Sequence, residues 1–157
     1  MRVTLQFIFI FTVILFPNFT FAENTDTNTS NETASVIELD KGEFLSKVFN
    51  YEKDLTKWTY EGNKPCVVVF YGDFCPPCRR LLPVLQSLAK EYQNEVTIYR
   101  VNITQEKEIA TIFNVQSIPF ILFVPMGEVP QTVMGALPQN DLQQIIDTFL
   151  LGKKIDQ

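Results

Sequence analysis

The residues best suited to chemistry in this chain are the two cysteines of the segment Cys75-Pro76-Pro77-Cys78. The segment follows an apolar run that predicts a buried strand, and it begins a predicted helix. Two intervening residues allow the two sulfur atoms to meet in a small disulfide ring. The helix N-terminus offers Cys75 unpaired backbone donors and the positive end of the helix dipole, which stabilise its thiolate form. The pattern favours thiol–disulfide exchange.

We expect the two cysteines to have different roles in such an exchange. The Cys75 thiolate attacks a substrate disulfide and forms a mixed disulfide, which Cys78 then attacks to release the reduced substrate. Cys78 lies one turn inside the predicted helix, so we expect it to be the less exposed of the two. Prolines suit a first helical turn, although Pro76 removes one amide that would face the thiolate. The Cys75–Cys78 disulfide is itself the redox centre, so no cofactor is expected.

Other uses of a cysteine pair need residues that this chain lacks. The sequence contains 3 cysteines and no histidine, so it lacks the four-cysteine and cysteine–histidine ligand sets of structural zinc sites, and no metal site is expected. Haem attachment requires a histidine after the second cysteine, where Arg79 stands. The lack of histidine also excludes Ser-His-Asp and Cys-His catalysis. A purely structural disulfide remains an alternative.

Charge and length limit the remaining function classes. The 157-residue chain has a formal net charge of −5 and no basic cluster, so nucleic acid and anionic membranes are not expected partners. Residues 36–157 have the length of one domain that buries its own core, which excludes a small disulfide-dense scaffold.

The first 22 residues have the pattern of a secretory signal peptide. Arg2 precedes an apolar run from Val3 to Phe16, and Thr20-Phe21-Ala22 has the small residues of a signal-peptidase site. The run of about 14 residues is shorter than the roughly 20 that cross a bilayer. We therefore predict cleavage near Ala22, a secreted or periplasmic mature protein and no stable membrane insertion. Anchoring by an uncleaved signal is the alternative.

The rest of the chain divides into a linker and one domain. Residues 23–35 contain no large apolar side chain and predict a flexible polar linker. Its two Asn-X-Ser/Thr sequons, and a third at Asn102-Ile103-Thr104, are interpreted as unmodified. Residues 36–157 alternate strands with helices and close with a hairpin and a helix, which predicts a three-layer α/β/α sandwich around a mixed sheet of about five strands. The predicted strands are 36–39, 66–71, 96–103, 119–124 and 129–134, and the predicted helices are 42–50, 77–93, 106–113 and 137–150.

The strand predicted over 66–71 is apolar at every position, so we expect it to be covered on both faces. Cys66 begins this strand, whereas the cysteine pair follows its other end, roughly 20 Å away. That separation excludes a disulfide between Cys66 and either member of the pair. We interpret Cys66 as a small buried apolar residue, with a regulatory thiol as the alternative.

Further landmarks follow the cysteine pair in a characteristic order. They are Phe70–Cys78 itself, Pro83 in the next helix, Ser117-Ile118-Pro119, the turn residue Gly127, and Met134-Gly135-Ala136 before the last helix. In order and spacing they resemble the thioredoxin family, from Val36 to about Leu151. The resemblance implies the thioredoxin fold, a kink of the active-site helix at Pro83, a cis peptide before Pro119 beside the cysteine pair, and protein disulfides as substrates.

The resemblance also implies which residues surround the reaction. The expected substrate surface consists of Phe74, Pro76, Pro77, Ile118, Pro119 and Gly135, of which Phe74 and Ile118 are the expected exposed contacts. Four residues are expected to tune the chemistry, namely Val69, Asp73, Arg79 and Arg100.

This chain departs from the family pattern at two of these tuning positions. Val69 replaces the buried aspartate that assists deprotonation of the second cysteine in many thioredoxins, and Arg100 replaces the usual lysine partner of that aspartate. We therefore predict weaker general-base assistance to Cys78, and an Arg100 paired with another acceptor. Asp73 and Arg79 are expected to be solvated charges.

The direction of electron flow is expected from the residue before the second cysteine. Strong oxidants and isomerases of the wider superfamily tend to carry histidine there, where this chain has Pro77. Less stabilisation of the thiolate gives a more reducing couple. We expect an extracytoplasmic thiol–disulfide oxidoreductase that acts as a reductase and receives electrons from a separate, membrane-borne donor. A disulfide oxidase or isomerase, and a non-catalytic binding or chaperone module, are the alternatives.

Overall fold

A computed structural model of the chain describes residues 35–154. These residues belong to the unit Glu32–Gln157. The signal peptide predicted over residues 1–22, and the linker predicted over 23–35 except for its last residue, lie outside the described residues and remain predictions. Within residues 35–154, no helix is long and apolar enough to cross a bilayer.

The centre of the fold is a mixed five-stranded sheet of order β1-β3-β2-β4-β5. Strand β2 pairs in parallel with β3 and antiparallel with β4, while β1 is parallel to β3 and β5 is antiparallel to β4. This confirms the predicted mixed sheet, with each strand within a few residues of its expected position. The strands are β1 Ile37–Glu38, β2 Cys66–Tyr71, β3 Thr97–Asn102, β4 Phe120–Val124 and β5 Gln131–Met134.

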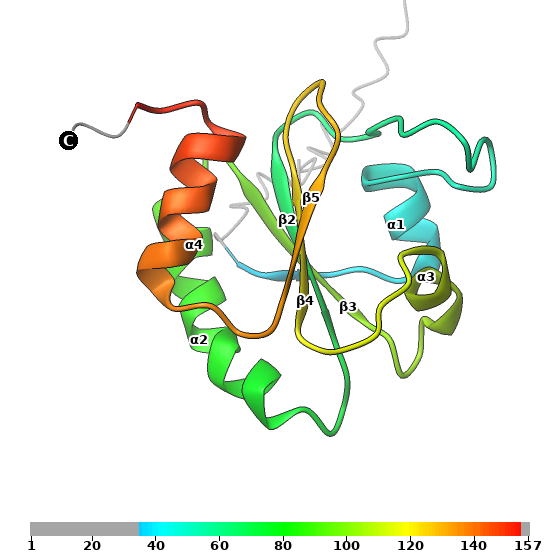
Figure 1. The fold of residues 1–157 in the computed structure, drawn as a ribbon, viewed down its shortest axis with the longest axis horizontal. Helices are drawn as coiled ribbons and strands as arrows, with labels where there is room; N and C mark the ends of the chain where they lie inside the picture. The colour runs from blue at the N-terminus through cyan, green and yellow to red at the C-terminus, as the bar shows by residue number, and fades with distance from the viewer. Residues whose placement is uncertain (1–34, 155–157) are drawn as a thin grey trace, which may run out of the picture. The chain divides into compact units, whose positions relative to one another are not determined.

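The helices cover both faces of the sheet, which confirms the three-layer sandwich. Figure 1 shows α2 and α4 on one face and α1 and α3 on the other. The helices are α1 Lys41–Lys47, α2 Pro76–Glu91, α3 Lys107–Ile112 and α4 Gln139–Ile145, which continues as a π-helical turn over Ile146–Leu150.

Helix α1 begins one residue before the predicted helix 42–50 and is capped by Asp40. The Asp40 side chain accepts a hydrogen bond from the Glu43 amide at 2.8 Å, and the Glu43 side chain faces the Asp40 amide in a capping box. The helix ends at Lys47 rather than at the predicted residue 50, because Phe49 leaves the helix and forms an isolated bridge with Tyr60.

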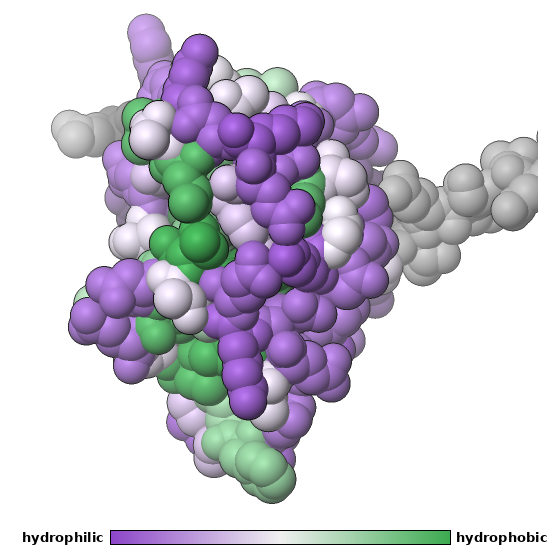
Figure 2. All heavy atoms as spheres, turned by 90° about the vertical axis from the view of Figure 1, so that its right-hand side faces the viewer, coloured by the Kyte–Doolittle hydropathy of each residue, from purple (hydrophilic) through white to green (hydrophobic). Residues whose placement is uncertain are grey.

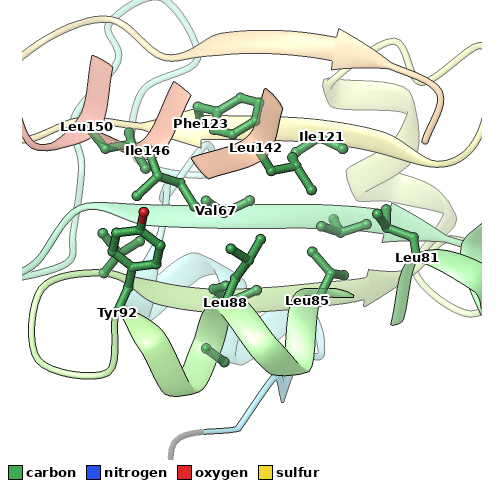
Figure 3. Packing of buried hydrophobic residues seen from close by; sticks show 14 residues of the cluster. Val67, Leu81, Leu85, Leu88, Tyr92, Ile121, Phe123, Leu142, Ile146 and Leu150 are labelled. Atoms are coloured by element: carbon green, nitrogen blue, oxygen red, sulfur yellow. The ribbon is translucent and has the colours of Figure 1, made fainter. Parts of the chain in front are cut away.

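Alternation along β2 divides the core into two layers. Val67 and Val69 face α2 and α4, whereas Cys66, Val68 and Phe70 face α1 and α3. Because side chains of a strand point alternately to its two faces, a strand that is apolar throughout supplies both layers. Figure 3 shows the first layer, in which leucines of α2 and the side chains of Leu142, Ile146 and Leu150 pack on the same face of the sheet, with Val67, Ile121 and Phe123 of the strands.

The second layer is rich in aromatic rings. Phe44 of α1 lies with its ring centroid 6.4 Å from Phe70 and 5.5 Å from Phe113. Trp58, in the long connection before β2, stacks on Phe49 at 4.5 Å. Figure 2 shows the outer surface of this side, which is mainly hydrophilic with an interrupted band of hydrophobic residues. The aromatic core therefore lies beneath a largely polar exterior.

Candidate active site

The predicted cysteine pair forms a disulfide at the junction between β2 and α2. The S–S bond joins Cys75 and Cys78, with their Cα atoms 5.2 Å apart. Cys75 is the N-cap of α2, and its Sγ accepts a hydrogen bond from the Cys78 amide at 3.2 Å. The strand therefore ends just before the reactive sulfur, and the helix N-terminus supplies a donor to it, as the sequence predicts.

The relative exposure of the two cysteines corrects one expectation. Cys75 is 3% exposed and Cys78 is 8% exposed, so Cys78 is not the less accessible residue. The cause is the capping geometry, since the Cys75 side chain folds back over the first turn of α2. The neighbouring Phe74 projects outwards instead and is 95% exposed.

Two prolines limit the backbone donors around Cys75. Pro76 and Pro77 occupy the first positions of α2, so neither has an amide to offer the sulfur. The donor is the Cys78 amide, while the next amide, of Arg79, is bound to the Cys75 carbonyl oxygen at 3.1 Å. The loss is greater than the single missing amide expected at Pro76. Further along, α2 continues through Pro83, which leaves the Arg79 carbonyl without its usual helical donor.

A second segment, before β4, approaches the active-site loop. The Ile118–Pro119 peptide is cis, as the family resemblance implies. A Cβ added at Gly72 would lie 3.0 Å from Cδ1 of Ile118, so glycine permits this close approach. Ile118 is half-buried by the arrangement, less open than expected of an exposed contact. The Gly135 amide donates to the Pro119 carbonyl oxygen at 2.7 Å, which ties the end of β5 to the same place.

Val69 of β2 and Arg100 of β3 are neighbours in the sheet, at the positions where many thioredoxins have an aspartate and a lysine. Because valine carries no charge, Arg100 pairs with another residue. Val69 is buried in the first core layer. The Arg100 guanidinium forms an ion pair with Glu38 and lies 4.8 Å from the centroid of the Tyr71 ring. The Tyr71 hydroxyl donates to the same Glu38 carboxylate at 2.8 Å. The acceptor expected for Arg100 is therefore Glu38, and slower deprotonation of Cys78 stays a prediction.

Asp73 is exposed, as expected of a solvated charge, but it is also hydrogen-bonded to the rest of the fold. Its carboxylate accepts a hydrogen bond from Nδ2 of Asn102 at 2.7 Å. Asn102 is buried and belongs to the sequon Asn102-Ile103-Thr104, so its amide nitrogen is engaged in the fold rather than available to a glycan. Sequence reasoning missed this contact, because neither residue carries a local signal for the other. Arg79 is exposed, as expected.

Cys66 lies apart from this chemistry. It is a free, fully buried cysteine in the second core layer. Burial raises the pKa of its thiol to about 12. Its predicted role as a small buried apolar residue agrees with both observations. Within residues 35–154, no group of three or more His, Cys, Asp or Glu side chains is arranged to hold a metal ion.

The shifted Cys66 thiol makes a pH dependence predictable. Because the pKa of Cys66 is higher in the folded chain than its ordinary value of 9.0, its contribution to stability is complete below about pH 9 and is lost as the pH rises towards about 12. Urea unfolding of the oxidised protein at a series of pH values should show this decline. Cys66→Ala is the matched control and should show a smaller decline between pH 9 and 10. An identical decline in both proteins would contradict the assignment.

Comparison with known proteins agrees with the fold and with the site. Residues 35–148 match the Thioredoxin family. A thioredoxin of Borreliella burgdorferi is 35% identical over 113 residues, which cover 72% of this chain and 96% of that protein. A chloroplastic M-type thioredoxin of Spinacia oleracea is 35% identical over 94 residues, 60% of this chain but 52% of that protein.

A solved structure is also similar. The crystal structure of chloroplastic thioredoxin z aligns with a TM-score of 0.59 at 18% identity, over 71% of this chain and 91% of that one, and this likeness concerns the fold. The family match, the curated relatives and the Cys75–Cys78 disulfide at the start of α2 lead to one conclusion. This chain belongs to the thioredoxin family, the disulfide oxidoreductases that act on protein disulfides through a cysteine pair and need no separate cofactor.

Proposed function

We propose that this protein is an extracytoplasmic protein-disulfide reductase in which Cys75 attacks and Cys78 resolves. The observation that carries the proposal is the placement of Cys75 Sγ at the N-cap of α2, where the Cys78 amide donates to it. A sulfur in this position is stabilised as a thiolate, which is the nucleophilic form in disulfide exchange.

The reaction transfers two electrons from the Cys75–Cys78 dithiol to the substrate disulfide, in two exchange steps. The Cys75 thiolate bonds to one sulfur of the substrate disulfide, the substrate S–S bond breaks, and the departing sulfur takes a proton. The Cys78 thiol then gives its proton to solvent and bonds to Cys75 Sγ, the mixed disulfide breaks, and the second substrate sulfur leaves as a thiolate that takes up a proton. The substrate leaves as a dithiol, and the chain is left with the Cys75–Cys78 disulfide seen in the structure.

The two prolines support the reducing direction. Each removes a backbone donor from the first turn of α2, and Pro77 also occupies the position where histidine stabilises the reduced state of strong oxidants. A couple whose reduced form is less stabilised gives up electrons more readily. The protein should therefore reduce substrates when an electron donor recharges it.

The location and the donor are proposed from the sequence. The signal pattern over residues 1–22, with cleavage near Ala22, favours a secreted or periplasmic protein. Cytoplasmic reductants do not reach that compartment, so a separate donor is required, and a membrane protein is the class that can carry electrons across. Fusion of residues 1–35 to a reporter that is active only outside the cytoplasm tests the location. Reporter activity supports export, and a reporter retained in the cytoplasm contradicts it.

Direct assay of both directions tests the function. The reduced protein should accelerate the reduction of insulin disulfides by dithiothreitol, whereas the oxidised protein should oxidise reduced, unfolded ribonuclease A slowly. The opposite pattern would make it an oxidase. Cys75 and Cys78 are largely buried residues, which favours a structural disulfide as the second candidate. Inactivity in both assays would support that alternative.

Phe74 provides a test of the proposed substrate surface. Its side chain is 95% exposed beside the reactive sulfur, so it is free to contact an extended substrate. Phe74→Ala should raise KM for insulin several-fold, since complete burial of a large apolar side chain contributes about 1.5–3 kcal/mol and partial burial against a substrate contributes about 1 kcal/mol. The rate with the small disulfide 5,5′-dithiobis(2-nitrobenzoate) should change little. Met126→Ala is the control, an exposed apolar residue in the distant β4–β5 turn that should leave both rates unchanged.

A further inference from the structure

We propose that Asn102 is a positioning residue, which holds the active-site loop so that Cys75 and Phe74 are presented to a protein substrate. The proposal rests on the proposed function. Asn102 is the one polar residue among the buried side chains of residues 35–154, at 6% exposed. A buried carboxamide is costly unless both of its ends are hydrogen-bonded. The partners of Asn102 therefore indicate what its burial achieves.

Both ends of the carboxamide bind loops that follow neighbouring strands. Its Nδ2 donates to Oδ1 of Asp73 at 2.7 Å, in the loop after β2. Its Oδ1 accepts a hydrogen bond from the Thr104 amide at 3.0 Å, in the turn after β3. The Thr104 hydroxyl oxygen in turn accepts from the Asp73 amide at 3.3 Å. Three hydrogen bonds thus close a ring between the two loops.

The ring acts directly on the segment that carries the chemistry. Asp73 stands one residue before Phe74 and two before Cys75. Gly72, in the same loop, lies against both Ile118 and Thr104. A Cβ added at Gly72 would lie 3.0 Å from Ile118 Cδ1 and 3.3 Å from Thr104 Oγ1. The loop is therefore held from the β3 side by Asn102 and Thr104. The exposed Phe74 side chain has no such support of its own.

The ring also fixes the position of a negative charge. The Asp73 carboxylate is negative, whereas the N-terminal end of the α2 dipole is positive. Asp73 also lies two residues before Cys75, which must ionise to react. A carboxylate free to approach Cys75 would oppose formation of the thiolate. Because Asn102 Nδ2 is the donor that binds this carboxylate, loss of the donor should change both the direction of the loop and the field at the sulfur.

Exchanging the donor Asn102 and the acceptor Asp73 tests whether their hydrogen bond positions the loop or whether Asn102 only fills space in the core. Asn102→Asp places a carboxylate against that of Asp73 and should lower kcat/KM for insulin reduction about tenfold, through KM. The double variant, Asp73→Asn with Asn102→Asp, reverses donor and acceptor but keeps every hydrogen bond of the ring. It should restore kcat/KM to within about threefold of the unsubstituted protein.

The reaction with 5,5′-dithiobis(2-nitrobenzoate) serves as the second readout. This small disulfide does not need the Phe74 surface, so Asn102→Asp should slow it less than threefold near pH 8. Equal losses with both substrates, or a double variant that folds and is not restored, would overturn the proposal. If Asn102→Asp does not fold, Thr104→Val against Thr104→Ser decides the question, because valine removes the hydroxyl acceptor of Asp73 and serine keeps it. Inactivity of the unsubstituted protein with both disulfides would instead reject the proposed function.

Discussion

Cys75→Ser is expected to lower the rate of insulin reduction by about a thousandfold or more, because a serine hydroxyl is hardly ionised at neutral pH and cannot form a disulfide. Cys78→Ser is expected to be equally inactive in turnover but for a different reason. It retains the attacking sulfur and the α2 N-terminus, so it should accumulate a mixed disulfide between Cys75 and the substrate. Mass spectrometry of the trapped adduct measures this directly.

The third cysteine supplies the matched control for this pair. Cys66→Ala removes a buried thiol that lies at the other end of β2 from the disulfide, and it should keep insulin reduction within about twofold. Activity of Cys75→Ser above a few per cent would contradict the assigned nucleophile. A mixed disulfide that forms between the substrate and Cys78 in the Cys75→Ser variant would mean that Cys78 attacks and Cys75 resolves.

Phe44→Ala is expected to reduce the free energy of unfolding by about 3–5 kcal/mol, the usual cost of deleting a fully buried phenylalanine. Phe44 is fully buried and faces the rings of Phe70 and Phe113, so its removal leaves a cavity between α1 and the sheet. Because a domain of this size is stable by only about 5–15 kcal/mol, much of its stability would be lost. Chemical denaturation of the oxidised protein measures the change.

Phe74→Ala is the surface control for the same substitution. The exposed ring of Phe74 contributes no core packing, so its loss should change the free energy of unfolding by less than about 0.5 kcal/mol. The two variants should therefore separate stability from substrate binding. A change below about 1.5 kcal/mol for Phe44→Ala would mean that the aromatic layer rearranges to fill the cavity.

Much of the fold was predictable because local patterns and tertiary structure agree. The apolar run of β2 requires cover on both faces, and the structure supplies it with alternate residues in two core layers. The prolines at the start of α2 mark the beginning of a helix, because the missing N–H of proline costs least in the first turn. The cysteine pair was predictable for the same reason, since its spacing and its position at a helix start are properties of neighbouring residues.

The parts that were not predictable depend on contacts between distant segments. The partner of Asp73 lies 29 positions away, and no pattern at either residue indicates the other. The exposure of Cys75 depends on how its side chain caps α2, which spacing does not determine. Periodicity placed a helix over residues 137–150, but it reports which side chains are buried rather than the π-helical hydrogen bonding of Ile146–Leu150.

The reduction potential of the Cys75–Cys78 pair, measured by equilibrating the protein without residues 1–22 in redox buffers and trapping free thiols, tests the central claim most directly. The account predicts a value near about −270 mV, as found for thioredoxin. A value between about −120 and −180 mV would contradict the reducing direction and indicate an oxidase or isomerase. A pair that never equilibrates with the buffer would contradict redox function itself and leave the disulfide a structural one.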